Sequence, residues 1–313
     1  MATQGERKGK TIASKIQTFV AAELAEPADP RAVGMAAALA AQYPGAARAV
    51  LFYGSCLREK NLDGLMLDFY LIVSDYRAAY GKRWLASANR LIPPNVFPFE
   101  HEGLISKYAV LSEADFARLC SLSAPDPSVW ARFAQPSRLI WAADDQARSD
   151  ACASVALAAP TLVALTEPTM EPGEAEADPL AVWRAGFALT YGAELRAERA
   201  ARPGSIVDAD PERYRRFGVA AREVAGQSPG VVSAEAREGA RARWRQMQRR
   251  GKRTVVLRLI KASFTFAGGI DYLAWKINRH AGTKIAIKPW QRRWPLAGAI
   301  TLLPRLFRSG AIR

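Results

Sequence analysis

Histidine and cysteine are scarce in this chain, which has 2 histidines and 3 cysteines among its 313 residues. His101 and His280 are too few for a histidine-based metal site, and they argue against a Ser-His-Asp triad. Cys56, Cys120 and Cys152 lie far apart and form no CxxC pair. The sequence therefore predicts neither a zinc ribbon nor a disulfide framework, and three reduced thiols are expected.

Long apolar runs are also lacking. The N-terminal residues have no continuous apolar core and no small-residue cleavage site, so no secretory signal is expected. The strongest candidate for a membrane span, Thr254–Trp275, is interrupted by Arg258, Lys261 and Asp271, and it falls short of the ~18–20 apolar residues that a span needs. We expect a protein on the cytoplasmic side of the inner membrane that does not cross it.

Acidic residues are nearly absent from the C-terminal quarter. From Arg237 to the end there are 19 Lys/Arg and 2 Asp/Glu, a net charge of +17, whereas the whole chain carries +14 and the earlier residues therefore −3. This asymmetry predicts contact with nucleic acid or with an anionic membrane. No zinc finger, RRM or KH motif is visible.

The end of the chain interleaves tryptophan with arginine, at Trp290, Arg292, Arg293 and Trp294, ahead of a short apolar stretch. Aromatic residues beside cations are typical of segments that lie in the membrane interface. We expect these four residues to bind a membrane surface. The alternative is a solvated basic tail whose apolar stretch packs on its own protein.

Hydropathy patterns and turn residues predict an α+β protein. Strands are expected at 47–53, 65–73, 106–111 and 137–141, the second being central because it is almost wholly apolar. Helices are expected at 11–26, 31–42, 75–89, 112–119, 179–200, 210–225, 233–249 and 254–280, and a loop at 167–178. This divides the chain into an α/β domain (1–145), a helical domain (146–250) and a basic C-terminal segment (251–313).

The chemistry is expected at Gly54-Ser55, which follows the first strand, and at Asp68, inside the second. Glycine lets backbone approach a triphosphate, and a serine hydroxyl can hold its oxygens. A carboxylate inside an apolar strand is costly unless it has a partner, and Mg²⁺ is a suitable one. This layout resembles nucleotidyltransferases of the DNA polymerase β type. Those enzymes usually carry a second acid two positions on, where this chain has Tyr70, so Asp63 or Asp75 would have to substitute.

Four motifs follow one another along the chain, Tyr-Gly-Ser at 53–55, Met-Leu-Asp-Phe at 66–69, Ser-Asp at 74–75 and Lys-Tyr-Ala-Val at 107–110. Their order and spacing resemble one family, the mitochondrial-type phosphatidate cytidylyltransferases, which are peripheral CDP-diacylglycerol synthases of the translocator assembly and maintenance group. Looser likenesses follow at 189–196 and 258–276. A lone strand acid is typical of that family, and the chain would be a divergent bacterial member.

The resemblance implies that CTP and phosphatidate react to give CDP-diacylglycerol and pyrophosphate, with Mg²⁺ as cofactor. It implies that Tyr53, Gly54, Ser55, Tyr191 and Arg196 bind the nucleotide, and that Asp68 and Lys107 are catalytic. Asp68 and Asp75 would hold the metal. The partners would be CTP and phosphatidate in an anionic membrane surface, without nucleic acid, and a homo-oligomer is compatible with this reading.

Two other functions remain open at this point. One is a nucleotidyltransferase with a soluble or nucleic-acid acceptor, in which the basic tail binds phosphates with an affinity that falls steeply with salt. The other is a non-catalytic membrane-surface protein of the same fold. Binding of a nucleotide that depends on Mg²⁺ and Asp68 separates both enzymes from the latter.

Overall fold

The computed structural model describes residues 15–59, 61–193, 203–226, 233–265 and 286–289. A helix over residues 15–24 comes first. The strands are β1 (Ala47–Tyr53), β2 (Met66–Val73), β3 (Asn95–His101), β4 (Leu104–Ser112) and β5 (Ser137–Ala142). The helices are α2 (Pro30–Ala41), η1 (Ser55–Arg58), α3 (Tyr76–Ala79), α4 (Arg83–Leu91), α5 (Glu113–Cys120), α6 (Trp130–Phe133), α7 (Asp145–Val155), α8 (Ala158–Thr166), η2 (Glu167–Thr169), α9 (Glu174–Ala177), α10 (Ala181–Tyr191), α11 (Pro203–Asp208), α12 (Pro211–Ala225) and α13 (Ala234–Thr265).

One mixed five-stranded sheet organises the N-terminal half, in the order β3-β4-β2-β1-β5. β2 and β4 are parallel, and the other neighbours are antiparallel. The expectation that β2 is central is confirmed, because β1 and β4 flank it and both of its faces are buried. Helices α2 and α3 cover one face of the sheet, and α5 and α7 cover the other.

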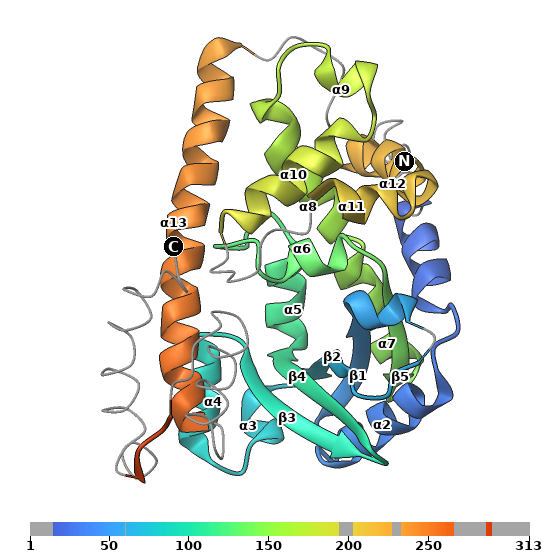
Figure 1. The fold of residues 1–313 in the computed structure, drawn as a ribbon, viewed down its shortest axis with the longest axis vertical. Coiled ribbons are helices and arrows are strands. Elements are labelled where there is room, and N and C mark those ends of the chain that lie inside the picture. The colour runs from blue at the N-terminus through green and yellow to red at the C-terminus, as the bar shows by residue number, and fades with distance from the viewer. Residues whose placement is uncertain (1–14, 60, 194–202, 227–232, 266–285, 290–313) are drawn as a thin grey trace, which may run out of the picture.

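The helical half packs on the second face and extends the molecule away from the sheet (Figure 1). Buried side chains from the sheet, from the helix at 15–24 and from α5 to α13 form one continuous core. Part of it is a buried ion pair between Glu23 and Arg213, whose guanidinium also donates to the Ala134 carbonyl. The boundary expected at 145/146 therefore lies inside a shared core.

Several local expectations differ from the structure. The segment at 95–101 is a strand, β3, that the sequence patterns did not indicate. The helix expected at 75–89 is two helices, α3 and α4, and the loop expected at 167–178 contains η2 and α9. The helices expected at 233–249 and 254–280 are continuous through Thr265 as α13, because Gly251 lies inside the helix and packs against the Ala193 carbonyl.

One helical stretch in the described part of the chain, Asp145–Thr169, is long and apolar enough to cross a membrane by those two measures. In its most apolar window 67% is buried within the protein. This stretch comprises α7, α8 and η2, whose apolar side chains belong to the shared core.

Candidate functional site

Five side chains, one from each strand, form a row across the sheet. The register pairs Pro98 (β3) with Lys107 (β4), Lys107 with Asp68 (β2), Asp68 with Tyr53 (β1), and Tyr53 with Ser137 (β5). Residues directly opposite one another in neighbouring strands point to the same face of the sheet. The adjacent residues on the same face of four strands, Leu51, Tyr70, Ala109 and Leu139, belong to the core shared with the helical half, so this site row lies on that face.

The centre of the site row is an ion pair. Lys107 Nζ lies 3.0 Å from Oδ1 of Asp68, and the side chains are 36% and 21% exposed. Oδ1 itself is buried, and the lysine approaches it outside hydrogen-bond geometry, so among the described residues this oxygen has no hydrogen-bond partner. The pair is partly exposed, and ion pairs that solvent reaches contribute only about 1 kcal/mol or less to stability. Folding therefore gives little reason for a carboxylate here, whereas ligand binding does.

Gly54 provides room beside that carboxylate. Its φ of +95° and ψ of −168° are accessible almost only to glycine. A Cβ at this position would lie 3.3 Å from Asp68 Oδ2. Ser55 follows it as the exposed first residue of η1, and Cys56 is buried with its Sγ 3.5 Å from the Met66 carbonyl. Burial raises the pKa of the Cys56 thiol, so this cysteine is a poor nucleophile.

Tyr53 joins the site row to the helices above it. Its ring centroid lies 5.2 Å from that of Tyr70 and 6.0 Å from that of Phe133 in α6. Burial, and secondarily the charge of Asp68, raises the pKa of Tyr53 well above its usual value, while Arg132 donates to its hydroxyl and opposes the rise. Tyr53 therefore stays protonated at neutral pH. Tyr70, at the place of the usual second acid, is a buried packing residue.

Sequence reasoning missed two polar residues near Asp68. Arg132 lies in α6 and reaches Tyr53, and Ser137 ends the site row with a buried Oγ that has no hydrogen-bond partner among the described residues. Neither residue stands in a recognisable motif. Only the β1–β5 pairing and the packing of α6 on β1 bring them to Tyr53, the neighbour of Asp68 in the site row.

The remaining expected site residues lie elsewhere. Asp75 follows the far end of β2, seven residues and roughly 20 Å of strand from Asp68. Its carboxylate caps α3 by accepting from the backbone N–H groups of Arg77 and Ala78, so the expectation that Asp68 and Asp75 share one metal is wrong. Tyr191 ends α10 and packs against the helical part of the core.

Five expected contacts fall outside the described residues. These are Arg196, expected to bind phosphate, and the four membrane-surface residues Trp290, Arg292, Arg293 and Trp294. They stay predictions from the sequence.

The donor set suits a magnesium ion that is shared with a substrate phosphate. The described residues contain no group of three or more His, Cys, Asp and Glu side chains that could enclose a metal. Mg²⁺ in nucleotide enzymes is commonly held by one or two carboxylates together with phosphate oxygens and water. Asp68 offers a carboxylate whose Oδ2 lies beside Gly54, while its buried Oδ1 is ion-paired with Lys107. The residues present therefore fit a metal–nucleotide complex better than a metal bound by protein alone.

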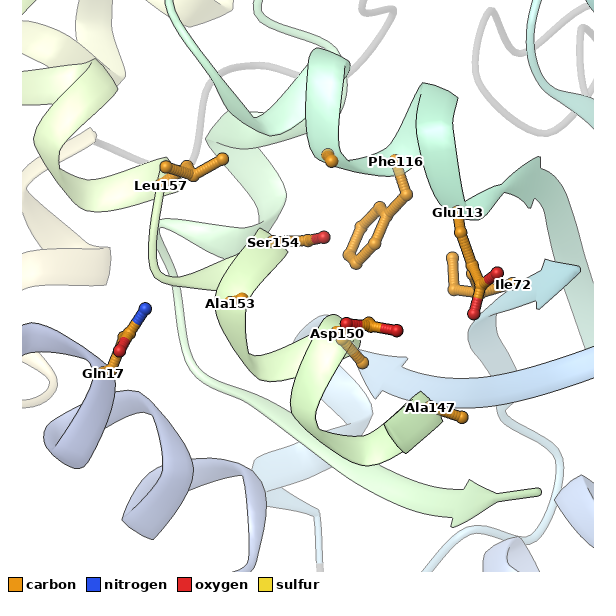
Figure 2. A pocket seen from close by; sticks show the side chains of 11 residues that line it. Gln17, Ile72, Glu113, Phe116, Ala147, Asp150, Ala153, Ser154 and Leu157 are labelled. Carbon is orange, nitrogen blue, oxygen red and sulfur yellow. The ribbon is translucent and has the colours of Figure 1, made fainter. Parts of the chain in front are cut away.

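A separate cavity of about 410 Å³ lies between the helix at 15–24, α5 and α7 (Figure 2). Phe116 and Leu157 contribute to its apolar wall, and its charged lining residues are Glu113 and Asp150. Its lining contains no lysine or arginine. The only charged groups that a phosphate would meet there are carboxylates, which repel it, so the cavity does not suit a triphosphate.

No protein-family model matches this chain, and a search of the curated proteins finds no match.

Proposed function

We propose that this protein is a magnesium-dependent nucleotidyltransferase, and specifically a peripheral phosphatidate cytidylyltransferase. The observation that carries the proposal is the juxtaposition of Gly54, Asp68 and Lys107, which offers space, a carboxylate and a cation at one point of the sheet. The choice of CTP and phosphatidate rests on the sequence resemblance. The basic C-terminal quarter is consistent with a lipid substrate.

In this proposal each residue has a separate task. Gly54 and Ser55 lie against the triphosphate, where any larger side chain at 54 would fill the space. Lys107 can reach a phosphate oxygen beside Asp68, because its ammonium group already lies 3.0 Å from that carboxylate. Asp68 would hold Mg²⁺ together with phosphate oxygens, and the ion supplies charge neutralisation at the reacting phosphates when bound.

The reaction needs little proton transfer. A phosphate oxygen of phosphatidate forms a bond to the α-phosphorus of CTP, and the bond between that phosphorus and the α–β bridging oxygen breaks. Pyrophosphate leaves with the bonding electron pair. The attacking phosphate monoester is already anionic near neutral pH, so no general base is required. Positioning of the two substrates and neutralisation of charge then account for most of the rate.

The test is pyrophosphate release from CTP with Mg²⁺ and phosphatidate-containing vesicles, with ATP, GTP and UTP in parallel. Asp68→Asn should abolish turnover, and because the Asp68–Lys107 pair is partly exposed and asparagine has the same shape, the variant should remain folded. Asp75→Asn is the matched control, since asparagine is an equally good helix cap and Asp75 lies at the other end of β2. Phosphatidate-dependent, CTP-selective turnover that fails only in Asp68→Asn would establish the function.

Other outcomes are equally decisive. Turnover with a different nucleotide would keep the nucleotidyltransferase and remove the cytidylyltransferase assignment. Absence of turnover and of Mg²⁺-dependent nucleotide binding, in folded and vesicle-bound protein, would leave a non-catalytic protein.

A further inference from the structure

Helix α4 presents apolar side chains to solvent. Trp84 and Leu91 are seven residues apart, so they lie on one face of the helix, and they are 48% and 80% exposed. Three exposed cations, Lys82, Arg83 and Arg90, flank them. Tryptophan and leucine among lysine and arginine are characteristic of helices that lie in a membrane interface.

The adjoining part of α13 has the same character. Arg249, Arg253 and Leu257 follow one another at four-residue spacing, with Arg250 beside them, so they share one face of the helix. All four are exposed, and Leu257 is 47% exposed. Gly251 belongs to the opposite face, which packs against the C-terminal end of α10.

Two side chains of α13 fix these helices side by side. Arg258 Nε donates to the Pro93 carbonyl at 2.7 Å, and its Nη1 donates to Ser128 Oγ at 3.0 Å. Lys261, buried, donates to the carbonyls of Ile92 and Pro94, the latter at 2.8 Å. The three carbonyl acceptors, at residues 92–94, follow directly after Leu91, so the end of α4 lies beside this stretch of α13 (Figure 1). We call the exposed residues of these two neighbouring stretches the α4–α13 surface; it comprises Lys82, Arg83, Trp84, Arg90, Leu91, Arg249, Arg250, Arg253 and Leu257.

The six cations of this surface have no carboxylate within ion-pair distance among the described residues. Before Arg249, three of the four arginines of the same helix are paired, Arg237 and Arg241 with Glu171 and Arg245 with Glu238, while Arg243 donates to the Leu122 carbonyl. The cations of the α4–α13 surface are therefore available to an anionic partner, and the partner must also accept exposed tryptophan and leucine.

We propose that the α4–α13 surface docks on an anionic lipid bilayer, with Trp84, Leu91 and Leu257 at the depth of the headgroups and the six cations against lipid phosphates. Aliphatic side chains gain little from a nucleic acid, whereas they enter the acyl boundary of a bilayer. The surface adjoins the start of β3, and Pro98 of the site row is three residues, about 10 Å, beyond Asn95. Its purpose rests on the proposed function, because it would hold the site row near a lipid phosphate.

The test uses full-length protein and vesicle flotation without nucleotide or phosphatidate. The probes are vesicles of phosphatidylcholine alone and of phosphatidylcholine mixed with phosphatidylglycerol. Arg249→Gln/Arg250→Gln/Arg253→Gln should bind the anionic vesicles roughly 100-fold more weakly, and Trp84→Ser/Leu91→Ser at least about tenfold more weakly. Controls outside this surface, which should bind like wild type, are Arg148→Gln/Arg216→Gln, at exposed residues that form no ion pair among the described residues, and Leu122→Ser/Val219→Ser.

Insertion is tested by fluorescence quenching with vesicles whose acyl chains are brominated. The wild type should lose more fluorescence on binding than Trp84→Phe does. Equal quenching in the two proteins, or unchanged vesicle affinity in both surface variants, would overturn the proposal. Binding of single-stranded RNA in place of vesicles would do the same.

The catalytic proposal can fail separately. Asp68→Asn should float with anionic vesicles as the wild type does, whether or not the wild type releases pyrophosphate. If the protein binds vesicles through the α4–α13 surface but shows no turnover, the proposed enzymatic function is wrong and the proposed membrane-binding surface is supported.

Discussion

Alanine in place of Gly54 should damage the candidate site more than it damages the fold. Its φ of +95° with ψ near 180° costs a non-glycine residue about 1–3 kcal/mol. Lower entropy of the unfolded chain returns about 0.4–1 kcal/mol, so the net loss of stability should be about 1–2 kcal/mol. The new Cβ would also meet Asp68 Oδ2 at 3.3 Å, and the carboxylate would have to move by a few tenths of an ångström.

Gly45→Ala is the matched control for this variant. Gly45 also has a positive φ, +72°, but a Cβ there meets nothing within 4 Å, and it precedes the opposite end of β1. The positive φ at this position should cost alanine about 1–2 kcal/mol of stability. The lower entropy of the unfolded chain offsets part of that cost, as it does for Gly54→Ala. Urea unfolding measures both losses, and calorimetric titration with CTP and Mg²⁺ measures binding. Gly54→Ala should bind at least about tenfold more weakly, and Gly45→Ala should bind normally. Equal binding in the two variants would refute the role of Gly54.

Three further perturbations test other parts of the structure. Glu23→Gln leaves the buried Arg213 without its counter-charge and should lower the free energy of unfolding in urea by about 3–5 kcal/mol. The control, Glu26→Gln, removes an exposed partner of Arg138 and should cost less than about 1 kcal/mol. Similar losses in the two variants would contradict the importance of the buried pair. Lys107→Ala should change stability by less than about 1 kcal/mol but weaken Mg²⁺–CTP binding at least about tenfold, and unchanged binding would exclude Lys107 from the site. Burial, and secondarily the charge of Arg258, lowers the pKa of Lys261 from its usual 10.5 to about 7. From about pH 7 to about pH 9 the unfolded chain therefore holds a proton on Lys261 that the folded chain has lost. The stability of the wild type should then rise with pH, relative to that of Lys261→Met, by up to about 1.4 kcal/mol per pH unit. Stability curves that run parallel with pH would show that the pKa of Lys261 is not lowered.

The elements that the sequence predicted well are those with a single dominant signal. β2 is an apolar run, which only a central strand buries on both faces. α5 begins where Ser112 caps it by accepting from the Asp115 backbone N–H, as the serine before acidic residues indicated. β3 escaped prediction because Pro98 lies within it and its apolar residues do not alternate cleanly. Its pairing with β4 over seven residues overrides this weak local preference.

Some residues of the candidate site could also be predicted from local sequence signals, and others could not. Gly54 and Asp68 could be found because each breaks the pattern of its surroundings, the glycine by ending a strand and the acid by interrupting an apolar run. Asp68 meets Lys107 because β2 and β4 pair in one particular register. The sequence alone does not say which strands pair, so this contact could not be predicted from it. Arg132 and Ser137 depend on still longer-range packing. Asp75 was misassigned because an acid after a strand serves equally well as a helix cap.

The ion pairs of α13 show which part of the basic C-terminal quarter can attract an anionic partner. Counted along the sequence, the basic quarter begins at Arg237. In the structure, Arg237, Arg241 and Arg245 are paired with acids of the same protein. Their charge is largely neutralised at the range of a Debye length, so it contributes little to attraction of an anionic partner. From Arg249 on there are 15 Lys/Arg and 1 Asp/Glu, a net charge of +14, so most of the expected attraction must come from this stretch. Within the described residues, Arg249, Arg250 and Arg253 are exposed near Leu257 and form no ion pair, whereas Arg258 lies 3.8 Å from Asp126.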